Sequence, residues 1–450
     1  MDLLGQIAAA GVVGCGGAGF PTHVKLNGKF EYLIVNGAEC EPLLRTDRYL
    51  MRSKAAEIVE AVSAIAAARQ IPQAVIALKH NYTREIAALK AAIAASGAAI
   101  ALHELESFYP AGDEQTIVYE VTGRVVPPGG LPSEVGAVVD NIATVYAVYE
   151  AMHAKAFTQK YLTVTGEVRE PKVLCVPVGT SLKHCIDLAG GALHETYFVV
   201  TGGPMMGRAV AAEALDEAVV TKTTSGILVL SASGYHATHS SVDVRHMLNR
   251  AKAACIQCTH CTQLCPRHLL GHPLEPHRIM RKMATGVDIR TLLDDPDVRN
   301  AQLCCECGIC EVYACPMELQ PRTINAMIKR ELGAAGIRYQ RPAQQAWTPS
   351  LQRDERKAPS ERVAARAGVY PYYHYEAETF CEDTPDEVSI PLKMNVGAAS
   401  VPVVCAGDRV ELGTLIAKAP DGALGAAVHA SIAGTVRAVG DKIVIVKDEV

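Results

Sequence analysis

The sequence predicts a multidomain protein of mixed α/β and α+β class, and three observations lead to that prediction. Short apolar strands alternate with Ala-rich helices in residues 1–155, which is the pattern of parallel βαβ units. Two four-cysteine runs lie among helical stretches between residues 255 and 316. Short β runs separated by Gly turns return after residue 388. With 450 residues, of which 49% are hydrophobic, the chain has room for about three or four domains of ~100–200 residues each.

The first unit, residues 1–155, should combine strands and helices around a glycine-rich loop that follows its first helix. In chain order we expect a helix over Asp2–Ala10, a strand over Tyr32–Val35, a helix near Ser53–Arg69, a strand over Ala74–Leu78 and a helix over Arg84–Ala95.

Four further segments follow this unit. Residues 156–235 predict a small α+β unit, with strands over Tyr161–Val168, Lys172–Val176 and Thr196–Gly202 and a helix over Ser181–Ala189. Residues 240–335 carry the cysteine runs among helices. Residues 336–388 are polar and Pro-rich, which predicts a connector that wraps a surface or is partly mobile. Residues 389–450 predict a compact all-β unit.

The two cysteine runs carry the clearest chemical signal. The first consists of Cys255, Cys258, Cys261 and Cys265, followed by Pro266, and the second of Cys304, Cys307, Cys310 and Cys315, followed by Pro316. The first run has the C-x2-C-x2-C-x3-C-P spacing of bacterial iron–sulfur ferredoxins. The second differs by one extra residue before its last cysteine. This spacing predicts two [4Fe–4S] clusters and therefore single-electron chemistry.

The ligands are expected to cross between the runs. In two-cluster ferredoxins the fourth cysteine of each run ligates the other cluster. One cluster would then take Cys255, Cys258, Cys261 and Cys315, and the other Cys304, Cys307, Cys310 and Cys265. The extra residue leaves open whether Cys315 and Cys265 ligate the other cluster or their own. Zinc usually shows cysteine pairs or mixed Cys/His ligands, and disulfide frameworks suit short secreted chains, so both alternatives fit these triplets poorly.

Bulk properties exclude several classes of partner. The formal charge of −5 gives no reason to expect nucleic acid or an anionic membrane surface. The N-terminus lacks a basic segment followed by an apolar one, and no run of about 18 apolar residues predicts a membrane span. Fifteen cysteines without an export signal favour a reducing cytoplasm.

The glycine loop matches a dinucleotide fingerprint by its letters alone. Gly14, Gly16 and Gly19 satisfy G-x-G-x-x-G, but the segment before them is predicted to be helical and Pro21 follows at once. A dinucleotide fingerprint needs a strand before the glycines and a helix after them, so the context fails. The loop could still approach a phosphate or a flat ring closely, with Lys25 within reach of an anionic group. The alternative is a tight structural turn.

Four segments resemble the FMN-binding regions of the flavin subunit of respiratory complex I and of the C subunit of Rnf complexes. They are Gly16–Thr22 with Lys25, Asn36–Pro42 with Asp47 beyond it, Tyr109–Glu114, and Asp140–Thr144. Residues 161–204 are similar to the soluble-ligand-binding β-grasp domain that follows in those proteins. The resemblance implies a Rossmann-like FMN domain, a β-grasp domain, and a helical ferredoxin-type domain with two [4Fe–4S] clusters.

The same resemblance implies roles for individual residues. FMN contacts are expected from Gly16, Gly17, Gly19, Lys25, Asn36 and Asn141. Lys25 would neutralise the phosphate or ribityl end. The carboxylates expected to line the side of the flavin that faces nicotinamide are Glu39, Asp113 and Glu114. The plainer interpretation of the carboxylates in Gly112–Glu114 is a solvated turn.

Domain order narrows the family. In Rnf C subunits a barrel-sandwich hybrid domain precedes the flavin domain, whereas here the similar stretch is residues 389–450. This order resembles the cobalamin reductases of bacterial propanediol-utilisation microcompartments. Barrel-sandwich domains often carry a cofactor on a lysine, but the corresponding turn reads His429-Ala430-Ser431, which argues against a swinging arm.

The resemblance implies a cytoplasmic enzyme within a microcompartment. Electrons would pass from NADH through FMN and two clusters to cobalamin, taking Co(III) to Co(II) and Co(I) and so supporting reactivation of a diol dehydratase. Expected partners are a shell protein and an adenosyltransferase. The sequence leaves NADH and NADPH undistinguished. Two other hypotheses are an Rnf-like subunit that hands electrons to a protein partner, and a scaffold that docks onto a shell. A cobalt-ligating histidine is conceivable among the seven between His236 and His277.

Overall fold

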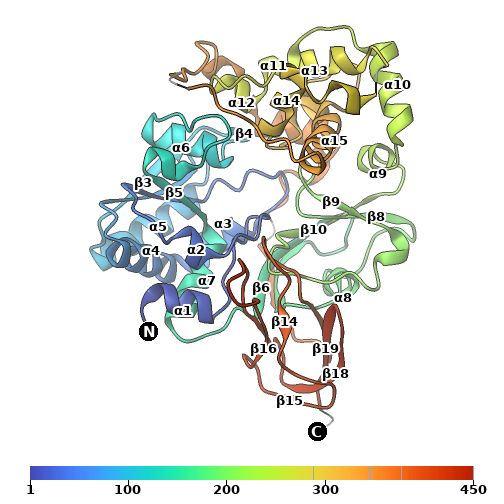
Figure 1. Ribbon diagram of the computed structural model, residues 1–450. Coiled ribbons are helices and arrows are strands. Elements are labelled where there is room, and N and C mark those ends of the chain that lie inside the picture. Colours follow the sequence, from blue (N-terminus) through green and yellow to red (C-terminus); the bar gives the residue numbers. More distant parts are fainter. Residues whose placement is uncertain (287, 344–345, 377, 449–450) are drawn as a thin grey trace.

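The computed structural model describes residues 1–286, 288–343, 346–376 and 378–448 of the chain (Figure 1). Residues 344, 345 and 377 of the predicted connector, residue 287 between the cysteine runs and residues 449–450 of the predicted all-β unit lie outside the described residues.

The N-terminal domain is a parallel four-stranded sheet, of order β3-β2-β1-β5, with helices on both faces. Its elements are α1 Leu3–Ala9, α2 Thr22–Lys25, β1 Tyr32–Asn36, α3 Thr46–Ser53, α4 Ala55–Arg69, β2 Gln73–Lys79, α5 Thr83–Ser96, β3 Ile100–Leu105, β4 Phe108–Tyr109, α6 Glu114–Thr122, η1 Pro132–Val135, β5 Ala137–Asn141 and α7 Ile142–Met152. Leu33 and Val35 pack into the core that includes α4 and α7, whereas Ile34 packs toward α6. Alternate residues of a strand face opposite sides, so both faces of this sheet must be covered.

The middle domain is a six-stranded sheet, of order β12-β7-β6-β10-β8-β9. Its elements are β6 Gln159–Gly166, β7 Lys172–Pro177, α8 Leu182–Leu188, β8 Tyr197–Thr201, β9 Arg208–Val210, η2 Ala212–Ala214, β10 Gly226–Ser231 and β12 Phe380–Glu382. The edge strand β12 comes from the predicted connector and pairs in parallel with β7.

The cysteine domain is helical and has a core of its own. Its elements are α9 Tyr235–Ser240, α10 Val244–Ala254, α11 His260–Gln263, α12 Pro266–Leu269, α13 Pro276–Met283, η3 Ile289–Leu292, α14 Pro296–Arg299, η4 Asn300–Leu303, η5 Ile309–Tyr313 and α15 Pro321–Ala334. In Figure 1 it lies across the top of the molecule, above both the N-terminal and the middle domains.

The connector crosses back over the N-terminal domain. It contains η6 Asp354–Arg356, β11 Ala358–Pro359, α16 Ser360–Arg366 and η7 Tyr370–Tyr372. Strand β11 pairs with β4, so this segment wraps a surface, the first of the two predicted alternatives.

The C-terminal domain consists of two small sheets over one core, of order β13-β19-β18-β15 and β14-β16-β17. Its strands are β13 Glu387–Pro391, β14 Val401–Pro402, β15 Arg409–Val410, β16 Leu415–Lys418, β17 Val428–His429, β18 Gly434–Val439 and β19 Lys442–Val446. The buried Lys222 ammonium joins it to the N-terminal domain by donating to the carbonyls of Ala427 and Gly11, each at 2.7 Å.

Candidate functional site

A cavity of about 360 Å³ opens at the carboxyl ends of β1 and β5. Ligands of open α/β sheets bind at this edge of the strands. The predicted residues that line the cavity are Gly16, Lys25, Asn36, Glu39, Asp113, Glu114 and Asn141. Among the described residues, Gly17 and Gly19 are not part of the lining. The four segments singled out in the sequence therefore meet at one place.

The glycines of the loop have different surroundings. The loop closes where the Gly14 amide donates to the Phe20 carbonyl at 2.9 Å. Gly17 has φ +111°, and no heavy atom lies within 4 Å of where its Cβ would be. Gly19 has φ +68°, and a Cβ there would come within 3.1 Å of the Met394 carbonyl oxygen. Gly19 is thus required by packing against the C-terminal domain, whereas Gly16 faces the cavity.

Lys25 is one of two lysines that line the cavity, the other being the buried Lys160. The Lys25 ammonium donates to Glu114 at 2.9 Å and lies 3.9 Å from Asp140. Burial alone would lower the pKa of Lys25, but the two carboxylates outweigh burial and raise it. One oxygen of the buried Asp140 has no hydrogen-bond donor among the described residues. A half-buried cation, an unsatisfied carboxylate oxygen and an open glycine loop fit a ligand that has an anionic end and polar ring edges, as FMN has.

Two acidic residues on the other side of the cavity, Glu39 and Asp47, accept hydrogen bonds from amide groups. Glu39, with φ +35°, accepts from the amides of Asp47 at 3.0 Å and Arg48 at 3.2 Å. Asp47 accepts from the Asn141 amide group at 2.7 Å. Burial, followed by the Glu39 charge, raises the pKa of Asp47 to about 7. Asn36 donates to the Gly112 carbonyl at 2.8 Å, so both predicted asparagines already organise the segments around them.

Asp113 reaches across to the cysteine domain. Arg267, two residues after Cys265, donates to the Asp113 carboxylate at 2.5 Å and 2.8 Å. The side chains of Asp113 and Arg267 are 11% and 8% exposed. Burial would raise the pKa of Asp113, but Arg267 outweighs it and lowers the pKa. Asp113, which was predicted to line the cavity, therefore also forms a buried salt bridge between the N-terminal domain and the cysteine domain.

The second cysteine run lies against the cavity. Cys305 and Cys307 belong to its lining, and the Tyr109 hydroxyl donates to the Cys307 carbonyl at 2.5 Å. We call Cys265, Cys304, Cys307 and Cys310 the inner cysteine site; their exposed fractions lie between 6% and 8%. Burial, then smaller effects that include Cys304 and Cys265, raises the pKa of Cys310.

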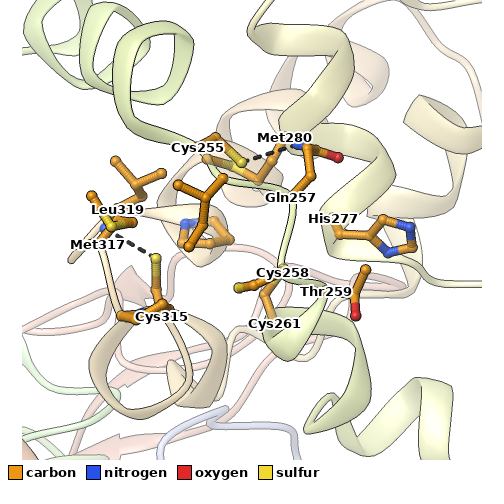
Figure 2. A pocket seen from close by; sticks show the side chains of 13 residues that line it. Cys255, Gln257, Cys258, Thr259, Cys261, His277, Met280, Cys315, Met317 and Leu319 are labelled. Atoms are coloured by element: carbon orange, nitrogen blue, oxygen red, sulfur yellow. Dashed lines mark hydrogen bonds between the residues drawn. The ribbon is translucent and has the colours of Figure 1, made fainter.

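The first run forms a second pocket together with Cys315. We call Cys255, Cys258, Cys261 and Cys315 the outer cysteine site; all four line this pocket. Figure 2 shows Cys258 and Cys315 on opposite sides of it, with Gln257 donating to the Cys255 sulfur at 3.0 Å. Burial, then Cys315, Cys258 and Cys255 in that order, raises the pKa of Cys261 to about 12.

A π-helical turn absorbs the extra residue of the second run. In the first run the Leu264 amide donates to the His260 carbonyl, four residues back, at 3.1 Å. In the second run Ile309–Tyr313 is π-helical, and the Ala314 amide donates to the Ile309 carbonyl, five residues back, at 2.8 Å. A π turn holds one residue more than an α turn. Cys315 therefore lies beside the first run despite the longer spacing.

The two cysteine sites suit a cluster better than a single ion. A mononuclear zinc site needs four ligands converging on one point at about 2.0–2.3 Å. Within the described ranges, no three His, Cys, Asp or Glu side chains are arranged in that way. A cubane instead takes one thiolate at each of four separate irons, which matches the four cysteines of the outer site distributed around its pocket.

Several residues at these sites were not predicted from the sequence. Cys305 is off the ligand spacing, Tyr109 lies in a matched segment without an assigned role, and Arg267 has no signal except its place after Cys-Pro. Three of the seven histidines already have hydrogen-bond partners: His236 the Ala367 carbonyl at 3.0 Å, His272 the Val126 carbonyl at 2.9 Å and His277 the Thr262 hydroxyl at 2.8 Å.

Comparisons with protein families agree with this architecture. Residues 7–150 match the Nuo51 FMN-binding domain, 161–209 the SLBB domain, 254–320 the 4Fe-4S dicluster domain and 366–450 the RnfC barrel sandwich hybrid domain. These matches confirm the predicted fold class and the predicted FMN and iron–sulfur cofactors. The last match begins before residue 389.

Curated relatives match over most of the chain. The cobalamin reductase PduS of Salmonella typhimurium is 41% identical over 98% of this chain and 95% of its own length. PduS of Citrobacter freundii is 40% identical over the same shares. The C subunit of the proton-translocating ferredoxin:NAD(+) oxidoreductase complex of Clostridium ljungdahlii is 37% identical over 60% of this chain and 56% of its own. In the described part of the chain, no helix is long and apolar enough to cross a membrane.

Proposed function

Because the chain belongs to the PduS family of cobalamin reductases, we propose that it passes electrons from NADH through FMN and two [4Fe–4S] clusters to cobalamin, reducing Co(III) to Co(II) and Co(I). The chain is an electron-transfer oxidoreductase with an FMN-binding and a 4Fe-4S dicluster domain. The observation that carries the proposal is the contact of the second cysteine run with the flavin cavity, through Cys305 and Cys307.

Different residues in and around the cavity have different proposed roles in binding FMN. Bound FMN accepts a two-electron hydride and releases electrons one at a time. Gly16 allows close approach of the backbone, and Gly17, outside the cavity lining, keeps the loop open. Lys25 neutralises the phosphate or ribityl end, and Asn36 and Asn141 orient the flavin. Gly19 supports the loop from behind. The carboxylates assigned to the nicotinamide side are Glu39, Asp113 and Glu114.

The positions of the cysteines support one order of the two clusters. The inner cysteine site, with ligands Cys265, Cys304, Cys307 and Cys310, borders the flavin cavity and accepts electrons first. The outer cysteine site, with ligands Cys255, Cys258, Cys261 and Cys315, lies in a pocket whose rim includes Ile256, 63% exposed. It delivers electrons to the acceptor. We place this activity in the cytoplasm, inside a microcompartment, with a shell protein and an adenosyltransferase as partners, in support of a diol dehydratase.

The decisive experiment is anaerobic reduction of cob(III)alamin by NADH, followed by the corrin spectrum. We expect the cob(II)alamin bands to appear only with NADH and loaded protein. A Lys25→Gln variant should retain less FMN and keep its iron. Zinc in place of iron in the purified protein, or loss of iron in the Lys25 variant, would contradict the assignment of the sites.

A second candidate is an Rnf-like subunit that hands electrons to a protein. The match to the Clostridium ljungdahlii subunit and the surface position of the outer cysteine site favour it. In that case NADH would bleach flavin and clusters while free corrin stayed oxidised.

A further inference from the structure

Arg267 occupies the boundary between the flavin cavity and the inner cysteine site. It lies in α12, which begins at Pro266, directly after Cys265. Its side chain leaves the cysteine domain and ends on Asp113 of the N-terminal domain. Arg267 is 7% exposed, so a fixed positive charge is buried where the two domains meet.

Asp113 is held rigidly on its own side. It is the N-cap of α6, and one of its carboxylate oxygens accepts from both the amide and the hydroxyl of Thr116, at 3.1 Å each. Both oxygens also accept from the guanidinium of Arg267. A bidentate arginine–carboxylate pair fixes orientation as well as distance. This pair therefore fixes how Cys265 lies relative to the cavity.

The arginine is also electrostatically close to the inner cysteines. Asp113, which binds the guanidinium, lines the flavin cavity together with Cys305 and Cys307 of the inner loop, and Arg267 follows Cys265 by two residues. The Arg267 charge therefore acts on two groups at once, the Asp113 carboxylate and the sulfurs of the inner site.

We propose that Arg267 is a positioning residue that holds the inner cysteine site against the flavin cavity and favours arrival of an electron there, with Asp113 as its opposing charge. The inference rests on the proposed function, because it needs a cluster at the inner site. One electron leaves reduced flavin and one reaches the inner cluster, with no bond made or broken there. The extra negative charge is stabilised by the guanidinium and destabilised by the carboxylate.

The test is an EPR-monitored redox titration of both clusters in the loaded full chain. Arg267→Gln should disfavour reduction of the inner cluster by about tenfold, a fall in midpoint potential of about 59 mV for one electron. Asp113→Asn should shift it in the opposite direction, and the double variant should lie between them. Arg267→Lys keeps the charge without the bidentate geometry and should lie near the unmodified protein. The outer cluster should not shift in any of them.

The control is Arg341→Gln, which breaks another bidentate pair between segments, with Glu134 at 2.7 Å and 3.1 Å, on the surface and outside the linings of the flavin cavity and the outer pocket. It should leave both potentials unchanged. Equal shifts in Arg267→Gln and Asp113→Asn, or none with full iron and FMN content, would overturn the inference. Absence of two clusters from the unmodified protein would instead overturn the proposed function.

Discussion

The inner and outer cysteine sites have nearly the same ligand pattern and very different surroundings. Every cysteine of the inner site is buried, and its loop borders the flavin cavity. At the outer site Cys255, Cys258 and Cys261 are only half-buried, and the surface residue Ile256 lies on the rim. Cluster potentials depend on solvent exposure and on hydrogen bonds to sulfur. Two similar motifs can therefore serve different roles: the buried inner site passes electrons on within the protein, and the more exposed outer site passes them to an acceptor.

The side chains next to the two cysteine sites differ as well. The inner site has a hydroxyl from Tyr109 and a guanidinium from Arg267 beside it, both of which tie it to the N-terminal domain. The outer site is surrounded by apolar side chains that include Met280, Met317 and Leu319 (Figure 2). The surroundings of the inner site fix its position relative to the flavin cavity, and those of the outer site leave one side open to an electron acceptor.

The largest expected effect comes from removing one ligand at each site. Cys310→Ser should lose about four of eight irons, one of two cubanes, and stop NADH-driven reduction of the outer cluster. Cys258→Ser should lose a similar amount but leave the inner cluster reducible. Iron analysis and EPR after NADH addition measure both effects. Cys405→Ser, an exposed cysteine of the C-terminal domain, is the control and should change neither. Reduction of the outer cluster in Cys310→Ser would contradict the order of the sites.

Loss of iron to a chelator should follow exposure. Because three of the four outer cysteines are half-buried and all four inner ones are buried, iron should leave in two phases of about four atoms each, on the basis of two cubanes. EPR should show the outer signal disappearing first. If the inner signal disappears first, burial does not protect that site.

Near the inner cysteine site, Glu41 should make the stability of the protein depend on pH. Its carboxylate accepts from the amides of Met205 and Met206 at 2.8 Å each, and a Cβ at Gly308 in the inner loop would come within 2.8 Å of the Met205 carbonyl oxygen. Burial raises the pKa of Glu41 to about 7 from 4.5. Since the pKa is raised, the stabilisation is complete below pH 4.5 and is lost as pH rises through about 7.

Between pH 5.5 and 7.5 the unmodified protein should therefore lose more unfolding free energy than Glu41→Gln, by on the order of 1–2 kcal/mol. Anaerobic urea unfolding measures this difference. Arg341 lowers the pKa of Glu134, so the contribution of Glu134 is lost only toward acid pH. Glu134→Gln should thus leave the slope in this range unchanged. Parallel slopes for all three proteins would rule out Glu41 as the titrating group.

The smallest expected effect is that of Tyr109→Phe. The change removes the hydrogen bond to the Cys307 carbonyl and should cost about 0.5–1.5 kcal/mol of stability. It should also broaden the inner EPR signal and leave the outer one unchanged. Tyr370→Phe removes an exposed hydroxyl that donates to Glu361 at 3.0 Å and should cost less than about 0.5 kcal/mol. Equal costs would mean that the Tyr109 contact does not support the inner loop.

Much of the candidate site could be predicted because it depends on local spacing. The cysteine triplets, Lys25 and the Glu39 segment were identified from short motifs, and the structure brings them to one pocket and one cavity or, for the inner cysteines, against that cavity. The role of Gly19 could not be predicted, because its neighbour Met394 is far along the chain. The partner of Asp113 was not predictable for the same reason.

The chemistry of the protein follows from its primary structure: eight cysteines with ferredoxin-like spacing, a glycine loop with a lysine, and the order of the domains. These are local patterns, since ligand spacing and backbone permissiveness are properties of a few consecutive residues. The folded chain was needed to show which cysteine run borders the flavin cavity, that a π turn brings Cys315 to the outer site, and that Arg267 binds Asp113. Each of these depends on packing between segments distant along the chain, where burial and charge pairing set the contact.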